Sequence, residues 1–411
     1  KETIDKVFEL ARVEEVIADF VVLKKSGANY KGLSPFTNEK TPSFMVSPVK
    51  QIWKDFSSGK GGNVIAFLME HEHFSYPDAL RFLAKKYNIL IEETEKSEEE
   101  KQKSNEKEAL FLINQFATKH YIENLIKKDE GISVGLSYLK DRGFSDEIIE
   151  KFAIGYSLDI KDEFFKKAIK SGYQKQNIEK SGLVINNINN IIDRFRGRII
   201  FPIRSMAGRV QGFGGRILSK KFKTGKYINS PESIIYIKSK VLYGIYESKK
   251  SIASQDLCYL VEGYTDVIQM HESGIQNVVS SSGTALSVEQ IQIIKRLTNN
   301  VTLLFDSDEA GLNASLRGVD LFLEQGINVR ILIFPNGEDP DSFVKDRVKS
   351  EILEFFNKYS KDFIEFKANL LLKNSKDDPI KKSSVVRDIV ISISKIPDLI
   401  KQEIFVKKCS E

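Results

Sequence analysis

The chain has 411 residues, of which 41% are hydrophobic, and a formal net charge of +5. This is longer than one ordinary hydrophobic core, so we expect two to four domains. No apolar run approaches the roughly 18 residues of a membrane span. The only cysteines, Cys258 and Cys409, exclude both a disulfide framework and a CxxC metal knuckle. We therefore expect a soluble, cytoplasmic, monomeric protein.

Residues 1–91 predict a small α/β module. An amphipathic helix is expected as far as Asp19, followed by short strands around NYKGL, SFMVS and QIWKDF. Further helices are expected to begin near Asn63 and Tyr76. Two glycine-rich strings, GKGGN in this module and GFGGR from Gly212, lack the spacing of nucleotide-binding loops, so we interpret both as turns.

Residues 92–108 are almost wholly charged or polar and cannot bury a core, so we expect a flexible or helical linker and a domain boundary. A mixed α/β region follows over residues 109–250. It begins with an amphipathic helix from Ala109, and the segment from Tyr138 to Ser157 predicts two short helices and a turn. The biased stretch VINNINNII before Asp193 is expected to form a loop or hairpin.

A basic stretch lies near the end of this region. Between Arg194 and Lys226 the chain has six arginines and four lysines and no acidic residue, a local charge of +10. Such a run is often a solvated face. Because apolar residues alternate with the arginines, we favour strands that hold the cations on one side, where they would bind phosphates.

Three acidic clusters mark residues 251–348: EGYTD from Glu262, DSDEAG from Asp306 and GEDPD from Gly337. The first two each follow a short apolar run and precede helix-like sequence, which predicts a parallel sheet with carboxylates at the carboxyl ends of its strands. Helical sequence completes the chain over residues 349–411.

Carboxylates two positions apart in extended backbone point to the same side, so Asp306 and Asp308 could share one ion, as could Asp339 and Asp341. Any single cluster is equally compatible with loop residues and helix N-caps. Three clusters at strand ends favour a site for magnesium or manganese, because these hard cations prefer oxygen ligands.

The chain resembles bacterial DNA primases of the DnaG type nearly from end to end. EGYTDV, LFDSDEAG and GEDPDSFV look like that family's toprim domain, and DRFRGRIIFPIR, GRVQGFGGRIL and KYINSPES like its basic subdomain. The resemblance implies a mixed α/β multi-domain fold: a zinc-ribbon-like module, a basic α/β subdomain, a Rossmann-like toprim sheet and a closing helical segment. It also implies magnesium-dependent synthesis of RNA primers from ribonucleoside triphosphates on single-stranded DNA, through an RNA–DNA hybrid.

The resemblance also assigns site residues. Glu262, Asp306 and Asp308 match the central metal ligands and catalytic carboxylates, with Asp266, Asp339 and Asp341 completing the acidic patch. Nucleotide and template contacts are expected from Lys226, Asn229 and Lys238, and more weakly from Arg142, Arg198 and Arg216, for which surface salt bridges are the alternative. The family's helicase-binding domain is expected to be absent from this chain.

The N-terminal module departs from the family pattern. Family members have YKGLCPFHNEKTPSF and a later CxxCG, which supply three cysteines and one histidine, whereas this chain has Ser34, Thr37, Asp55 and Ser58 at those positions. Hydroxyls and one carboxylate do not make a tetrahedral zinc site, so we predict no structural zinc. We expect hydrogen bonds among these four residues to replace it, supported by Phe44, Trp53 and Phe56.

Two further interpretations concern the module's surface. Lys50, Lys54 and Lys60 flank Trp53 and Phe56, which predicts either a stacking surface for single strands or ordinary packing of two aromatic residues. His71 and His73 are expected to be surface residues, because side chains at i and i+2 do not share a helix face.

Other functions remain open on sequence alone. A toprim nuclease or a topoisomerase-like enzyme would use the same acidic clusters, although neither would need the basic subdomain sequences. A catalytically weak nucleic-acid-binding or scaffold protein would fit the altered zinc positions.

Overall fold

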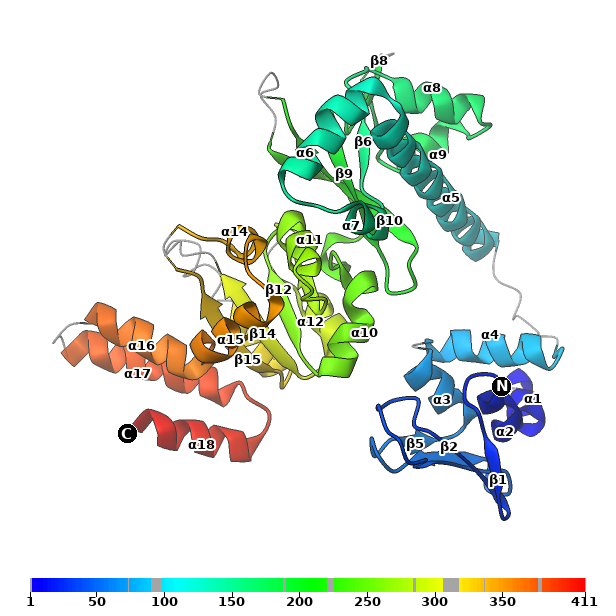
Figure 1. The fold of residues 1–411 in the computed structure, drawn as a ribbon, viewed down its shortest axis with the longest axis vertical. Helices are drawn as coiled ribbons and strands as arrows, with labels where there is room; N and C mark the ends of the chain where they lie inside the picture. The colour runs from blue at the N-terminus through cyan, green and yellow to red at the C-terminus, as the bar shows by residue number, and fades with distance from the viewer. Residues whose placement is uncertain are drawn as a thin grey trace. The chain divides into compact units, whose positions relative to one another are not determined.

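The computed structural model describes residues 2–72, 74–89, 98–187, 190–219, 225–283, 286–305, 318–335, 337–375 and 379–410. The chain forms two compact units, Lys1–Lys101 and Gln102–Glu411 (Figure 1). Each unit has a hydrophobic interior of its own. Across the described ranges, no helix is long and apolar enough to cross a membrane.

The first unit is a five-stranded antiparallel sheet packed against four helices. The strands pair in sequence order, and the elements are α1 (Glu2–Leu10), α2 (Val13–Ala18), β1 (Lys24–Ser26), β2 (Asn29–Gly32), β3 (Phe44–Ser47), β4 (Ile52–Asp55), β5 (Gly61–Gly62), α3 (Val64–His71) and α4 (Tyr76–Lys86). The three predicted strands and the starts of α3 and α4 are confirmed. The single predicted first helix is wrong, since it is divided into α1 and α2, and the end of GKGGN forms β5 instead of a turn.

Alternating burial along β4 explains how this sheet faces its core. Trp53 and Asp55 point inward, whereas Ile52 and Lys54 are exposed. Helix α3 begins where the Asn63 side chain accepts a hydrogen bond from the Ala66 amide at 2.9 Å, which satisfies one of the free donors of its first turn.

The second unit begins with a long helix and an antiparallel sheet of order β11-β10-β9-β6 (Figure 1). The elements are α5 (Glu98–Lys127), a π-helix (Gly131–Leu136), α6 (Ser137–Asp141), α7 (Asp146–Lys151), β6 (Gly155–Ser157), α8 (Glu163–Lys170), α9 (Lys175–Lys180), β7 (Val184–Asn187), β8 (Asn190–Asp193), β9 (Arg198–Arg204), β10 (Val210–Ile217), β11 (Tyr227–Asn229) and a 3-10 turn (Lys238–Lys240). The predicted helices around Tyr138 and the β7–β8 hairpin are confirmed. Helix α5 already includes the last part of the predicted linker.

The turn predicted at GFGGR is wrong, because this string lies inside β10. Its glycines serve close packing. A Cβ on Gly214 would lie 2.4 Å from the ring of Tyr264, and one on Gly215 would lie 2.5 Å from Phe195. Strand β10 therefore needs residues without side chains where these aromatic rings cross it.

A second sheet, of order β13-β12-β14-β15-β16, is parallel except at its edge strand β16. Its elements are α10 (Ile245–Gln255), β12 (Cys258–Val261), α11 (Tyr264–Glu272), β13 (Val278–Ser280), α12 (Val288–Lys295), β14 (Asn300–Phe305), β15 (Asn328–Ile333), α14 (Pro340–Lys345), α15 (Lys349–Tyr359) and β16 (Lys361–Asp362). Tyr259 and Val261 belong to one core and Cys258 to another, so apolar side chains cover both faces. The predicted parallel sheet is confirmed.

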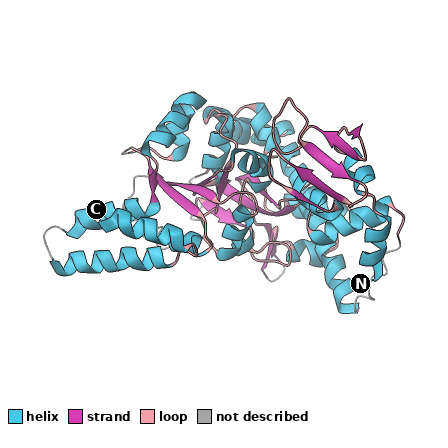
Figure 2. Cartoon of the chain, turned by 90° about the horizontal axis from the view of Figure 1, so that it is seen from below, coloured by secondary structure: helices cyan, strands magenta, loops and turns pink. Residues whose placement is uncertain are grey.

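Three helices complete the chain: α16 (Phe363–Ser375), α17 (Pro379–Ser394) and α18 (Leu399–Ser410). Helices α16 and α17 lie side by side (Figures 1 and 2). Ile389, Ile393 and Ile396 join Phe363 in the core that also contains Val329 and Ile331 of β15. The helical segment thus packs on the parallel sheet through its inner face.

Candidate active site

The acidic edge of the parallel sheet is built at the carboxyl ends of β12 and β14. Glu262 directly follows β12 and is exposed. Strand β14 pairs with β12 in parallel, with Leu303 opposite Leu260, and ends at Phe305. Asp306 and Asp308 follow it in the sequence but lie outside the described residues. The adjacency of these two strand ends is the structural basis for a joint site.

Asp266 and Asp339 both cap helices. The Asp266 carboxylate accepts a hydrogen bond from the Gly263 amide at 2.8 Å at the start of α11. The Asp339 carboxylate accepts hydrogen bonds from the amide and the hydroxyl of Ser342, at 2.7 and 2.6 Å. These contacts are the helix-capping alternative that the sequence left open.

The expectation that Asp339 and Asp341 lie on one side of an extended segment is wrong. Asp339 is extended, but Pro340 begins α14, so Asp341 lies in the first helical turn. Asp341 is mostly buried and forms an ion pair with the Arg142 guanidinium. Arg142 also donates a 3.0 Å hydrogen bond to the Tyr138 hydroxyl. Two residues predicted to contact metal and phosphate are thus bonded to each other.

Arg198 is not placed to contact a nucleic acid. Its residue is only 3% exposed, and its guanidinium donates to the carbonyl oxygens of Gly215 and Gly225, both at 3.2 Å. It ties β9 to β10 and to the chain before β11. The expected phosphate contact is therefore wrong, because the cation lies inside the sheet.

Three arginines of the basic stretch form ion pairs with acidic residues from elsewhere in the chain. The pairs are Arg196 with Asp159 at 2.7 Å, Arg204 with Glu247 at 2.9 Å, and Arg209 with Glu108 at 2.8 Å. The interpretation of the whole stretch as a one-sided phosphate-binding stripe is wrong for these arginines. A local count of charge cannot reveal distant partners.

Four predicted contact residues remain at or near the surface. Lys226 is exposed, and Lys238 begins the 3-10 turn and is half-buried. The Arg216 guanidinium lies 4.9 Å from the Tyr138 ring centroid and donates a 3.0 Å hydrogen bond to the Tyr227 hydroxyl. Asn229 is half-buried beside the toprim-like sheet, and its amide is hydrogen-bonded on both sides, to Tyr264 and to Ser282.

The donor chemistry of the acidic edge fits a hard divalent cation. Glu262 offers carboxylate oxygens in an exposed position, and such oxygens are the ligands that magnesium and manganese prefer. Within the ranges that the structure describes, no three acidic, histidine or cysteine side chains already form a metal-binding group. Glu262 is the described carboxylate of the edge that has neither a capping role nor an arginine partner.

The four residues at the family's zinc positions form a hydrogen-bonded cluster around Asp55, which is fully buried. Ser34 donates to the Asp55 carboxylate at 2.9 Å, and Ser58 donates to it through both its hydroxyl and its amide. Thr37 joins the cluster through its amide, which donates to the Ser34 hydroxyl at 3.1 Å. Its hydroxyl also forms a 2.6 Å hydrogen bond with Ser57, which itself donates to Asp55.

These contacts control the charge state of Asp55. Burial by itself would raise the pKa of Asp55, but the hydrogen bonds from Ser58 and Ser34 outweigh burial and hold the pKa below the usual aspartate value. The predicted cluster is present, with Ser57 and Ser43 as members that the zinc alignment did not indicate. As a ligand set it does not fit zinc, since it offers hydroxyls and one carboxylate already committed to hydrogen bonds.

The aromatic residues of this module divide into a core and a surface. Trp53 is 1% exposed and stacks on Phe36 and Phe44, with ring centroids 5.3 and 5.5 Å away. Phe56 is 69% exposed, so the expectation that it supports the cluster is wrong. Trp53 therefore belongs to the core, as the packing alternative predicted. Phe56 and Lys54 are exposed, so they stay candidates for the predicted stacking surface.

His71 is not the simple surface residue that its spacing suggested. Its ring stacks on Phe67 at 5.1 Å and its Nδ1 lies 2.8 Å from the Glu72 carboxylate. His73 lies outside the described residues. The sequence argument considered only that His71 and His73 do not share a helix face. It did not consider that the His71 ring could pack on an aromatic residue of the core such as Phe67.

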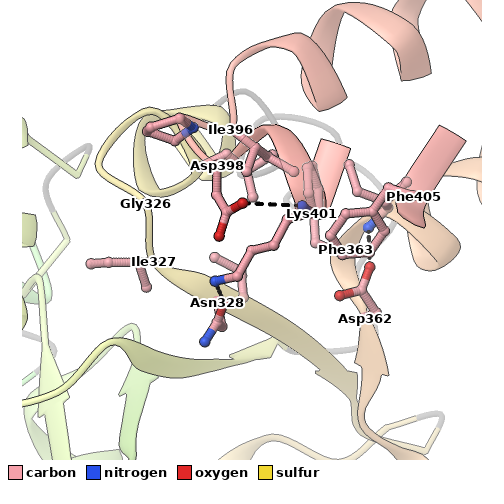
Figure 3. Close-up of a pocket in the computed structure, with 13 residues that line it drawn as sticks. Gly326, Ile327, Asn328, Asp362, Phe363, Ile396, Asp398, Lys401 and Phe405 are labelled. Carbon is pink, nitrogen blue, oxygen red and sulfur yellow. Dashed lines mark hydrogen bonds between the residues drawn. The ribbon is translucent and has the colours of Figure 1, made fainter. Parts of the chain in front are cut away.

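A separate cavity of about 180 Å³ lies between β15, α16 and α18 (Figure 3). Lys401 reaches the Asn328 side chain at 2.8 Å, and the Asp398 carboxylate accepts the amide hydrogens at the start of α18. Its lining is otherwise largely apolar, with Ile396 and Phe405 among the residues drawn. Its polar groups serve the packing of α18, away from the acidic edge.

Three family models match successive parts of the chain. They are a CHC2 zinc finger over residues 1–99, the N-terminal domain of the DNA primase catalytic core over residues 120–249, and a Toprim-like domain over residues 259–344. An acidic edge on a toprim-like sheet, joined to this core domain, defines a nucleotidyltransferase.

Relatives and solved structures specify the family. The chain is 36% identical to the DNA primase of Clostridium acetobutylicum and 34% identical to that of Listeria innocua, over all of its own length and 67% and 66% of theirs. The zinc-binding and RNA polymerase domains of Aquifex aeolicus primase match with a TM-score of 0.65 and 31% identity, covering 99% of this chain and 96% of that one. A DnaG primase catalytic domain bound to single-stranded DNA matches with a TM-score of 0.68 and 30% identity, covering 74% and 96%. The chain belongs to the DnaG-type DNA primases and spans about two thirds of the length of these curated relatives.

Proposed function

We propose that this chain synthesises short RNA primers on single-stranded DNA, with ribonucleoside triphosphates as substrates and Glu262, Asp306 and Asp308 as the central catalytic carboxylates. The observation that supports this most is the position of Glu262, exposed at the end of β12 beside the end of β14. Parallel sheets bind ligands at this edge.

The reaction joins a 3′ hydroxyl to an α-phosphate and releases pyrophosphate. Magnesium, when bound, would lower the pKa of the attacking hydroxyl and neutralise charge that develops on the phosphate. Glu262 would hold that cation with Asp306 and Asp308. Lys226, Lys238 and Arg216 lie on the basic subdomain and would bind nucleotide or template phosphates. Asp266, Asp339 and Asp341 would contribute mainly by shaping the loops at this edge.

The test is a primer-synthesis assay with single-stranded template, labelled ribonucleotides and magnesium. The unmodified chain is expected to yield short RNA, Asp306→Ala is expected to yield none, and Glu289→Ala, which changes an exposed glutamate of α12, serves as the matched control. No product from the unmodified chain, or equal yields from all three, would contradict the proposal.

We also propose that the N-terminal module folds without zinc. The cluster around Asp55 joins the two loops that zinc joins in the family, since Ser34 precedes β3 and Ser58 follows β4. A hydrogen bond to a charged group contributes about 1.5–3 kcal/mol, so several such bonds can hold these loops together. Magnesium would then be the metal on which activity depends.

The test uses the purified full chain. Elemental analysis is expected to find no stoichiometric zinc, and overnight dialysis against EDTA should leave the thermal unfolding of the module unchanged. Trp53 is the only tryptophan in the chain and is buried in this module, so its fluorescence reports this unfolding alone. One zinc per chain, or a lower melting temperature after EDTA, would overturn the proposal.

The module would still contact the template through Phe56 and Lys54. Both residues are exposed. The Phe56 ring could stack on a base while the Lys54 ammonium attracts a phosphate of the same strand. Phe56→Ala is expected to weaken single-stranded DNA binding, measured by fluorescence anisotropy, while Val49→Ala, which changes another exposed apolar residue of the module, leaves it unchanged.

A further inference from the structure

A closed ring of hydrogen bonds connects Glu262 to the basic subdomain. The Ser280 hydroxyl donates to the Glu262 carbonyl oxygen at 2.6 Å and accepts from the Ser282 amide at 2.8 Å. The Ser282 carbonyl oxygen accepts from the Asn229 side-chain amide at 3.2 Å, and the Asn229 oxygen accepts from the Tyr264 hydroxyl at 2.7 Å. Tyr264 is two residues after Glu262, so the chain itself closes the ring.

Every part of this ring is held in place by its surroundings. Ser280 is fully buried at the end of β13, and Asn229 ends β11. Tyr264 is 2% exposed and stacks parallel to Phe201 with ring centroids 5.2 Å apart.

Ser282 is the strained member of the ring. It has a positive φ of 58°, a conformation that residues other than glycine seldom adopt. Such a conformation persists when surrounding contacts over-determine it. Its amide and carbonyl groups both take part in the ring, which supplies contacts of this kind.

The carboxylate of Glu262 depends on this backbone for its direction. Among the described residues, no hydrogen bond or ion pair holds the carboxylate itself, whereas the carbonyl of the same residue is fixed by Ser280. A fixed carbonyl fixes the peptide plane, and the plane determines where the side chain leaves the strand.

We propose that Ser280, Tyr264 and Asn229 are positioning residues, which hold Glu262 in the direction that binds the metal ion and couple it to strand β11 of the basic subdomain. This inference rests on the proposed function. It also gives Asn229 a role through its side-chain bonds to the ring, beyond the direct nucleotide contact that the family resemblance implied. Residues that orient metal ligands without touching the metal commonly change metal affinity by about 10- to 100-fold.

The experiment measures manganese binding to the full chain by electron paramagnetic resonance titration, in the absence of nucleotides. Ser280→Ala is expected to raise the dissociation constant about tenfold. Tyr264→Phe should have a similar effect, and the double variant should be little worse than either single variant, because one break already opens the ring.

Ser248→Ala is the matched control. Ser248 is also fully buried and donates to a backbone carbonyl, that of Val278, at 2.6 Å, but it takes no part in the ring. The melting temperature measured by circular dichroism is expected to fall by similar amounts in Ser280→Ala and Ser248→Ala. Manganese affinity is expected to fall only in Ser280→Ala. Equal manganese affinity in these two variants would overturn the inference.

Glu262→Ala separates the two levels of the argument. If it binds manganese as tightly as the unmodified chain, the metal role of Glu262 fails, and the proposed function fails with it. If Glu262→Ala loses affinity and Ser280→Ala does not, only the positioning role is wrong. In primer synthesis, Ser280→Ala should need about tenfold more magnesium for half-maximal rate.

Discussion

Two regions of this chain correspond to metal-binding parts of the DNA primase family, and they differ in what has happened to the ligands. In the N-terminal module the zinc positions hold Ser34, Thr37, Asp55 and Ser58, and the structure shows hydrogen bonds among the loops that carry them. At the parallel sheet the carboxylates remain, with Glu262 exposed at the strand end.

The difference follows from what each ion does. A structural zinc ion joins two loops, and hydrogen bonds to a buried carboxylate can perform that task. A catalytic magnesium ion stabilises charge on the substrate, and no local hydrogen bond among protein groups replaces this. The module can therefore change its ligands, whereas the sheet edge must keep them.

Replacing Glu262 should have the largest effect. Glu262→Ala is expected to lower primer synthesis by more than about 100-fold, because it would remove the ligand that we propose for the catalytic cation. Fluorescence melting through Trp53 should not change, since Glu262 belongs to the second unit. Activity within a few-fold of the unmodified chain would show that the sheet edge is not the catalytic site.

Replacing Asp55 should affect stability instead. Asp55→Ala leaves the buried hydroxyl of Ser34 and the half-buried hydroxyl of Ser58 without their acceptor and should destabilise the first unit by about 3 kcal/mol. Urea unfolding followed through Trp53 measures this loss. Ser75→Ala, which removes the cap of α4 in the same unit, is the control and should cost only about 1 kcal/mol.

The same carboxylate predicts how the module responds to acid. The pKa of Asp55 is lowered in the folded state, so its contribution is fully present above the unfolded value of about 3.9 and is lost as the pH falls through the folded pKa. The first unit should therefore lose stability below about pH 4. Asp55→Asn should reduce this acid dependence, and an unchanged slope would assign it to other groups.

The smallest effect concerns two basic residues for which the family resemblance implied nucleotide or template contacts, Lys226 and, more weakly, Arg198. Lys226→Ala should weaken template binding and reduce the slope of log affinity against log salt by about 0.7, the value for one phosphate contact on a single strand. Arg198→Ala should lower the melting temperature instead, because it removes the donor to Gly215 and Gly225. Anisotropy titrations at several salt concentrations and thermal melts distinguish these outcomes.

The sequence predicted features that depend on short-range pattern. The strands of the N-terminal module, the strand before Glu262 and the parallel pairing of β12 with β14 follow from runs of apolar residues and the turns between them. The hydrogen-bonded cluster around Asp55 could be predicted because substitution at the four zinc positions is visible in the chain.

Features that depend on distant partners could not be predicted. Arg204 is neutralised by Glu247 and Arg209 by Glu108, residues 43 and 101 positions away. Asp341 pairs with Arg142 because α14 begins at Pro340, so the segment is helical there and not extended as the spacing of the two aspartates suggested. Ser280 lies outside the sequence motifs on which the family resemblance rests, and only the structure places its hydroxyl against the Glu262 carbonyl oxygen.

The contrast between the two regions is tested most directly by restoring one metal at a time. The full chain is stripped of metal with a chelator and then dialysed into buffer that contains neither zinc nor chelator. Primer synthesis is assayed after addition of magnesium alone. The account predicts full recovery of activity with magnesium and no further gain from zinc. Recovery only when zinc is also supplied would contradict it.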